Sequence, residues 1–287
     1  MRPELKPDIQ LIEKHLRAIS CLRDPFENPE MLAEVQQYIA KELVSYGYTT
    51  ETHAFEFEKR TFENVIGYRA PRPDKPRLII GAHFDAVPGS PGADDNASGV
   101  AGMLEIARIL APFEISQHID FIGFNMEEYG MIGSRHYAPY LKKGDAKLLG
   151  MVSLEMIGFT SSQKGSQKLP LPLKPFYPNT GNFVALVGDL KSQEFLKQAK
   201  TAFKEVPGLP VETLVVPANG WIFFDVRLSD QSAFWDAGYP ALLITDTSFF
   251  RNPYYHTPSD KISTLNFDFL AKIVEGVTYL AFNLIKP

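Results

Sequence analysis

From residue 77 to the C-terminus, short apolar runs alternate with segments whose apolar residues have helical spacing. The apolar runs are RLIIGAHF (77–84), HIDFIGF (118–124), LLGMVSLEMI (148–157), FVALVGD (183–189) and PALLIT (240–245). Helical spacing occurs in 97–111, 133–142, 191–205 and the C-terminal FDFLAKIVEGVTYLAFNLI. Strands buried on both faces give continuous apolar runs, and the connecting helices then cover the sheet. The sequence therefore predicts an α/β fold with a mixed, mostly parallel central sheet and helices on both faces.

The segment before residue 77 adds further elements. Residues 8–20 and 30–46 have an apolar stripe at helical spacing, and TTETHAFEF and ENVIGYR are rich in β-branched and aromatic residues. They predict two helices followed by two strands, with PRPDKPR (71–77) as a hairpin-like connection.

No internal repeat or domain linker interrupts the chain, so we expect one domain over residues 1–287. Residues 160–182 differ from the rest, because they contain prolines and little periodicity. A structureless loop of this length is often functional in a compact domain. A lid or substrate wall and a plain surface insertion are both compatible with this pattern.

Charge and cysteine content exclude several classes of protein. The net charge of −5 and a pI near 5.7 do not fit a nucleic-acid or anionic-membrane surface, which needs concentrated positive charge. No apolar run reaches the roughly 18 residues that span a bilayer. Cys21 is the single cysteine, so an internal disulfide is excluded, and no secretory signal is visible at the N-terminus. We therefore expect a cytoplasmic protein.

Acidic and histidine residues follow the ends of the apolar runs. These residues are His83, Asp85, Asp94, Asp95, Glu127, Glu128, Glu155 and His256. In α/β sheets, functional groups collect in the crevice at the carboxyl ends of the strands. Each residue also has an ordinary explanation on its own: Asp94–Asn96 is a good helix N-cap, and Glu127–Glu128 is a common solvated pair. Only their joint occurrence in this order favours a shared site.

Carboxylates that meet in a crevice repel one another and are costly to desolvate. Few lysines or arginines accompany these segments, and Arg135 and Arg251 are the nearest. Bound divalent metal would supply the missing positive charge. Mixed histidine and carboxylate ligands suit zinc, with manganese or cobalt as alternatives.

Taken together, the segments resemble the co-catalytic zinc aminopeptidases, family twenty-eight of the metallopeptidases, whose relatives include glutamate carboxypeptidase and glutaminyl cyclase. The resemblance rests on GAHFDAVPGSPGADDNASGV, NMEEYGMIGSRHYA, SLEMIGF, SDQSAFWDAGYPALLITDT and YHTPSD. It implies a three-layer zinc-aminopeptidase fold, a single catalytic domain, a peptide substrate and two divalent metal ions. The oligomeric state is left open.

The resemblance also implies a role for each site residue. His83 and Glu155 would bind one metal, Glu128 and His256 the other, and Asp94 would bridge the two. Asp85 would orient the imidazole of His83, and Glu127 would be the general base. A cis peptide would follow the bridging aspartate, between Asp94 and Asp95.

Two departures from the family pattern concern the chemistry. Many members have aspartate where this chain has Glu155, and Ser-Asp-His where it has Ser229-Asp230-Gln231. The group that steadies the oxyanion is therefore open, and the candidates are Arg227, Tyr254 and Tyr255. Several aromatic residues flank the motifs and belong either to a side-chain pocket or to the core, namely Trp221, Phe223, Phe224, Phe249 and Phe250.

Rival functions remain. No G-x-S-x-G, P-loop or G-x-G-x-x-G pattern supports a serine hydrolase or a nucleotide-binding protein. A single-zinc acyltransferase similar to glutaminyl cyclase is an alternative that a metal content near one would favour. A non-catalytic binding protein on the same scaffold is the other, although such scaffolds tend to lose ligands or the base.

Overall fold

The computed structural model describes residues 5–71 and 75–285. Within them, eight strands form one sheet in the order β1-β2-β4-β3-β5-β8-β6-β7. Their bounds are β1 Thr49–Phe57, β2 Arg60–Tyr68, β3 Arg77–His83, β4 Ile119–Phe124, β5 Leu148–Glu155, β6 Val184–Asp189, β7 Val211–Val216 and β8 Ala241–Thr245. This confirms the predicted strands, and β7 is an additional one.

The direction of the strands determines where the site lies. The central strands β4, β3, β5 and β8 pair in parallel, so their carboxyl ends share one edge of the sheet. Strand β6 runs antiparallel to β8, which brings the start of β6 to that same edge. The outer pair β1 and β2 joins β4 through antiparallel pairing. The sheet is mixed and mostly parallel in its centre, as predicted.

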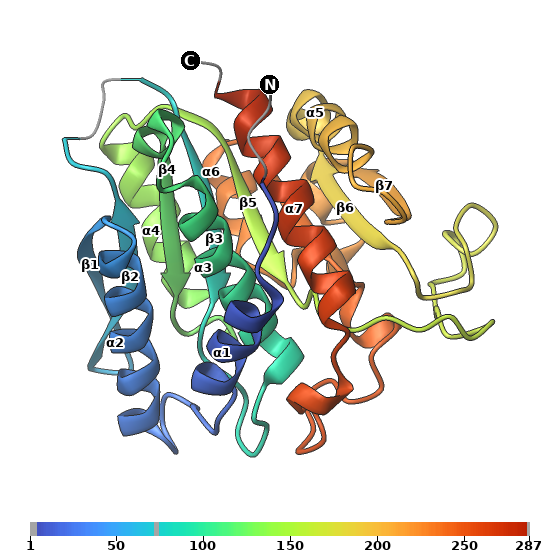
Figure 1. The fold of residues 1–287 in the computed structure, drawn as a ribbon, viewed down its shortest axis with the longest axis horizontal. Coiled ribbons are helices and arrows are strands. Elements are labelled where there is room, and N and C mark those ends of the chain that lie inside the picture. The colour runs from blue at the N-terminus through green and yellow to red at the C-terminus, as the bar shows by residue number, and fades with distance from the viewer. Residues whose placement is uncertain (1–4, 72–74, 286–287) are drawn as a thin grey trace.

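Helices cover both faces of the sheet (Figure 1). The α-helices of the described residues are α1 Ile9–Ile19, α2 Pro29–Ser45, α3 Gly99–Leu110, α4 Ile132–Lys143, α5 Gln193–Phe203, α6 Gln231–Ala237 and α7 Phe267–Leu284. One core joins the sheet to α1, α2, α3, α5 and α7, and a second core on the opposite face joins it to α4 and α6. The three-layer α/β architecture follows from these two cores.

Sequence patterns explain how the helices attach. The stripe of α2 that the sequence predicts, Leu32, Val35, Ile39 and Leu43, is buried. Helix α3 is buried on nearly all sides, because α1 and α7 pack on it while it lies on the sheet. Its apolar character all round fits this central position.

The sequence did not predict α6 or β7. Helix α6 has seven residues, too few to establish a helical period. Strand β7 lies at the edge of the sheet and is mostly only half-buried. The connection predicted at 71–77 falls partly outside the described residues. In the described part of the chain, no helix is long and apolar enough to cross a membrane.

Candidate metal centre and active site

Parallel strands deliver the acidic and histidine side chains to one edge of the sheet. His83 is the last residue of β3 and Glu155 the last of β5. Glu127 and Glu128 follow β4, and His256 lies in the loop after β8. The predicted convergence of these segments is therefore found in the structure.

The aspartate that joins this group is Asp95, and the prediction of Asp94 in this place is wrong. Asp95 Oδ1 lies 3.2 Å from His83 Nε2, and Asp95 Oδ2 lies 3.1 Å from His256 Nε2. The cis peptide is correspondingly Asp95–Asn96, one residue later than expected. The backbone turn before α3 decides which of two adjacent acids faces the site.

Among the described residues, two sets of three possible metal ligands share Asp95. The first is His83, Asp95 and Glu155, and the second is Asp95, Glu128 and His256. His83 Nε2 lies 3.4 Å from Glu155 Oε1, and His256 Nε2 lies 3.1 Å from Glu128 Oε2. Asp95 thus directs one oxygen to each imidazole, the arrangement expected of a bridging carboxylate.

Asp94 has different partners. Its Oδ1 accepts a hydrogen bond from the backbone N–H of Gly158 at 2.9 Å, and its Oδ2 accepts one from Asn252 Nδ2 at 2.6 Å. The carboxylate of Asp260 accepts the backbone N–H groups of both Asp94 and Asp95 at 2.9 and 3.1 Å. Asp94 and Asp260 therefore hold the turn that presents Asp95. Asp260 belongs to the segment YHTPSD, so its place in that segment was the one sequence signal that could have pointed to it.

Arg23 fixes the chain just before this turn. The buried guanidinium donates to the carbonyl oxygens of Phe84, Pro91 and Gly92 at 2.8, 2.6 and 2.9 Å. Gly92 has a φ of 56°, and a Cβ there would lie 2.2 Å from the carbonyl oxygen of Asp95. Only glycine fits this close approach. Arg23, from the N-terminal segment, gave no recognisable signal in the sequence.

Asp85 supports the two glutamates as well as the histidine. Its Oδ1 and Oδ2 accept the backbone N–H groups of Glu127 and Glu128, each at 3.1 Å. His83 Nδ1 lies 3.5 Å from Asp85 Oδ1. The carboxylate therefore fixes the backbone that carries both glutamates and lies beside the imidazole that the resemblance assigns it to orient.

Glu127 is placed differently from Glu128. Its Oε2 lies 3.9 Å from His83 Nε2, and it belongs to neither ligand set, although it lines the same cavity. It is buried, with 8% of its surface exposed. The geometry leaves this carboxylate next to the ligand sets without including it in them.

Comparisons with known proteins identify the family. Residues 64–281 match the family model described as Peptidase family M28. The chain belongs to this peptidase family. The chain is therefore a hydrolase that acts on peptide bonds.

Several individual proteins are similar to the peptidase. The uncharacterized protein YfbL of Escherichia coli is 34% identical over 95% of this chain and 87% of its own length. A solved zinc aminopeptidase from Bacillus subtilis is 27% identical and matches 80% of this chain and 52% of its own, with a TM-score of 0.61. The peptidase spans about half the length of the curated relatives that are named aminopeptidases.

A glutaminyl cyclase from Porphyromonas gingivalis has the same fold. It is 15% identical to the peptidase and matches 99% of this chain and 100% of its own, with a TM-score of 0.72. The likeness concerns the arrangement of the elements only.

The electrostatics of the peptidase site show a shortage of positive charge. Burial raises the pKa of Glu127 well above its usual value, with Glu155 and Glu128 adding to the effect and His83 opposing it. Burial and the charge of Asp95 raise the pKa of Glu128 to about 7. Burial lowers the pKa of His83, but Glu155 and Glu127 outweigh it and hold the pKa well above its usual value. A cation between these groups would relieve the repulsion.

The departure from the family pattern at Glu155 is accommodated by its neighbours. Glu155 Oε2 accepts a hydrogen bond from the hydroxyl of Ser229 at 2.8 Å while Oε1 faces His83. Gln231, the other departure, donates to the carbonyl oxygen of Val226 at 2.6 Å and is buried outside the cavity lining. The glutamine therefore supports the neighbouring loop and does not face the substrate side.

Of the three candidates for the oxyanion, Tyr255 alone lines the cavity. Its ring stacks on the imidazole of His256, with ring centroids 3.7 Å apart. Arg227 is buried instead in an ion pair with Asp236 at 2.6 Å and lies 3.9 Å over the ring of Trp221. Arg227 is therefore committed to holding its own loop.

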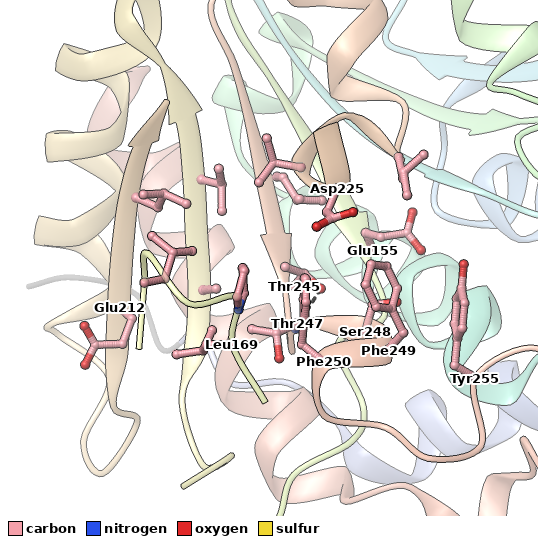
Figure 2. A pocket seen from close by; sticks show the side chains of 18 of the residues that line it. Glu155, Leu169, Glu212, Asp225, Thr245, Thr247, Ser248, Phe249, Phe250 and Tyr255 are labelled. Atoms are coloured by element: carbon pink, nitrogen blue, oxygen red, sulfur yellow. Dashed lines mark hydrogen bonds between the residues drawn. The ribbon is translucent and has the colours of Figure 1, made fainter. Parts of the chain in front are cut away.

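An apolar cavity of about 120 Å³ adjoins the cluster (Figure 2). Phe249 and Phe250 line it, whereas Trp221 and Phe224 are exposed and Phe223 packs at the edge of the second core. The proline-rich loop contributes its wall through Leu169, Pro170, Leu173 and Tyr177. Residues of the segment 160–182 therefore form part of the cavity wall, and a role of this wall in substrate binding stays a prediction.

Proposed function

We propose that this peptidase is an aminopeptidase that removes N-terminal residues from peptides with the help of two divalent cations, zinc in the first place. The observation that carries the proposal is the sharing of Asp95 by two ligand sets directly beside Glu127 and an apolar cavity. Each set consists of histidine and carboxylate donors, which suit zinc.

The spacing of the donor atoms supports a tetrahedral ion in each set. Zinc binds nitrogen and oxygen at about 2.0–2.2 Å, which separates neighbouring ligand atoms in a tetrahedron by about 3.3 Å. The four contacts that Asp95, Glu155 and Glu128 make to the two imidazoles are 3.1–3.4 Å long. Glu128 Oε1 is buried without a hydrogen-bond partner in the described structure. The spacing of these ligand atoms therefore suits a bound cation better than direct contacts among the ligands.

Two such ions, when bound, supply an acidified water and positive charge for the oxygen of the scissile carbonyl. The residues of the chain do the remaining work. Glu127 accepts the proton of the attacking water and returns it to the leaving nitrogen. Asp85 keeps Glu127 in place through its backbone, and the Tyr255 hydroxyl offers a hydrogen bond to the developing oxyanion.

The charge of the cavity favours a substrate with a free amine. Carboxylates from the cluster line one end, and Asp225 lies further along. Among the described residues, neither lysine nor arginine nor histidine belongs to the cavity lining. A protonated N-terminus would be attracted to such a surface, whereas a C-terminal carboxylate would be repelled.

The two rival functions make different demands. A single-zinc acyltransferase would leave one of the two ligand sets without a purpose, and a binding protein would have no need of the buried acid Glu127. The single catalytic domain and the cytoplasmic location stay predictions.

A pair of measurements tests the proposal. Elemental analysis of purified protein should give two metal ions per chain. A peptide with a free N-terminus should be cleaved from that end, and its N-acetylated form should not. Equal cleavage of both peptides would contradict aminopeptidase action, and cyclisation of N-terminal glutamine with one bound ion would favour the acyltransferase.

A further inference from the structure

The cavity beside the cluster is long in one direction. Its lining extends from Glu155 to Glu212, and Figure 2 shows these two labelled residues on opposite sides of the view. The carboxylate of Glu212 turns away from the other labelled side chains, so its stem closes the far end. If the protein is the aminopeptidase proposed above, the first side chain of the substrate would occupy this cavity.

The floor of the cavity is a row of residues on adjacent strands. Glu155 of β5 pairs with Thr245 of β8, Thr245 pairs with Ala185 of β6, and Ala185 pairs with Glu212 of β7. All four line the cavity. Neighbouring strands lie about 4.8 Å apart, so the row spans about 14 Å. The floor is therefore long enough for an extended side chain that begins at the metal cluster.

The row next to it supplies apolar side chains. Leu243 of β8 pairs with Val187 of β6, which pairs with Leu214 of β7, and these three also line the cavity. They lie on the same face as the first row, because side chains alternate along a strand. A straight aliphatic chain over Thr245 and Ala185 would thus contact apolar groups along its whole length.

The opposite wall is held in place by the proline-rich loop. Gln167 donates to the Thr247 hydroxyl at 2.8 Å and accepts from Arg251 Nε at 2.9 Å. Further along, the Tyr177 hydroxyl donates to the carbonyl oxygen of Thr213 on β7 at 2.9 Å. Because both parts of the loop are attached to the body of the protein, the loop fixes the width of the cavity. The residues of the floor then determine its depth.

Ala185 is the smallest side chain of the floor and lies at its middle. It is partly accessible, whereas its neighbours Val184 and Leu186 are buried on the other face. Any larger residue at this position would project into the cavity between Thr245 and the β7 end. The depth of the cavity therefore depends on Ala185.

We propose that Ala185 is a specificity-determining residue, which keeps the cavity open toward β7 and so selects N-terminal residues with long side chains. Each methylene that leaves water for the apolar floor contributes about 0.8 kcal/mol, which corresponds to about a fourfold gain in kcat/KM.

A homologous series of anilides tests the proposal. The substrates are the p-nitroanilides of L-alanine, L-2-aminobutyrate, L-norvaline and L-norleucine. With the wild-type protein, kcat/KM should rise about fourfold per added methylene. With Ala185→Leu, the ratio of the norleucine rate to the alanine rate should fall about tenfold or more, because the new side chain fills the space that norleucine needs. Ala185→Ser, which keeps the size, should preserve the rise.

A second variant makes the test independent of whether Ala185→Leu folds. A binding measurement makes it independent of turnover. Leu214→Phe narrows the far end from another strand and should reduce the norleucine rate alone. Calorimetry of L-norleucine and L-alanine binding to the metal-loaded protein should give the same order without any hydrolysis.

A flat wild-type series, or an equal loss on every substrate in Ala185→Leu and Leu214→Phe with unchanged melting temperatures, would overturn the role of Ala185. Neither result would affect the free-amine test, so a failure here is distinguishable from a failure of the proposed function.

Discussion

Asp94 and Asp95 are adjacent in the chain, yet their carboxylates have different partners. Asp95 lies 3.2 and 3.1 Å from the imidazoles of His83 and His256, whereas Asp94 is hydrogen-bonded to Gly158 and Asn252. One residue therefore faces the proposed ions and the other holds the turn. The pair gives a matched test of the site.

Asp95→Asn should lose most of the bound metal, because the substitution removes the negative charge that both ligand sets share and replaces one of its two carboxylate oxygens, each of which faces one set, by an amide nitrogen. Asp94→Asn should keep the metal but lower the free energy of unfolding by about 1–3 kcal/mol, since the new amide nitrogen cannot accept the hydrogen bond from Asn252. Elemental analysis and denaturant unfolding separate the two effects. Equal metal content in both variants would contradict the bridging role of Asp95.

Glu127→Gln should retain both ions and lower kcat by about 10²–10⁴, the usual contribution of a general base. The matched control is Glu128→Gln, which should lose metal because Glu128 Oε2 lies 3.1 Å from His256 Nε2. Steady-state kinetics with an amino-acid anilide, together with elemental analysis, check both. Unchanged turnover in Glu127→Gln would exclude it as the base.

Tyr255→Phe should lower kcat by about 10²–10³ if its hydroxyl donates to the oxyanion, which is the range for the loss of one such donor. Tyr254→Phe is the control, because Tyr254 is not part of the cavity lining. The same anilide assay distinguishes them. A similar small loss of kcat in both variants would mean that groups other than Tyr255 stabilise the oxyanion.

Removal of the metal should destabilise the fold, since the buried carboxylates of the cluster would then repel one another. When zinc is added back to the metal-free protein at about 100 times the dissociation constant of the protein–zinc complex, the free energy of unfolding should rise by about 2.7 kcal/mol. Thermal unfolding with a chelator, with zinc and with magnesium measures this. A melting temperature that is the same with the chelator, with zinc and with magnesium would contradict metal binding by this cluster.

His15 belongs to neither ligand set, and it predicts a separate pH effect on stability. Burial lowers its pKa from 6.5 to about 4, and its ring nitrogens lie 2.7 and 3.2 Å from the hydroxyls of Tyr38 and Tyr46. The unfolded chain binds a proton on this residue below pH 6.5, whereas the folded chain does so only near pH 4. Stability therefore falls as the pH drops from 6.5 to 4, by about 3 kcal/mol from this group.

The comparison with His15→Gln isolates that contribution, because other groups titrate in the same range. Denaturant unfolding at about pH 7 and about pH 4.5, on either side of the unfolded-state pKa, should show a smaller loss in the variant than in the wild type. Parallel pH profiles would show that His15 does not carry the effect.

Much of the site could be predicted from where polar residues end apolar runs. His83 ends β3 and Glu155 ends β5, and parallel strands bring such ends together at one edge. The sequence pattern at each strand end is therefore local, whereas the convergence of these strand ends at one site involves the whole sheet. The same reasoning could not choose between Asp94 and Asp95, because the choice depends on a turn held by Arg23, Gly92 and Asp260.

The cavity shows the other limit. Ala185 was an ordinary residue of a predicted strand, and Glu212 belonged to no predicted element. Their alignment with Glu155 arises from pairing between β5, β8, β6 and β7. Strand β7 was not predicted at all. The floor could only be recognised once the register was known.

The sequence by itself determined the fold class and the kinds of side chain at the site. Both follow from the local order of residues, namely the hydrophobic periodicity and the polar residues that end the apolar runs. The tertiary structure decided which aspartate joins the two histidines and how deep the adjoining cavity is. Both depend on contacts between segments far apart in sequence, where a shift of one residue turns a side chain to another partner or another face.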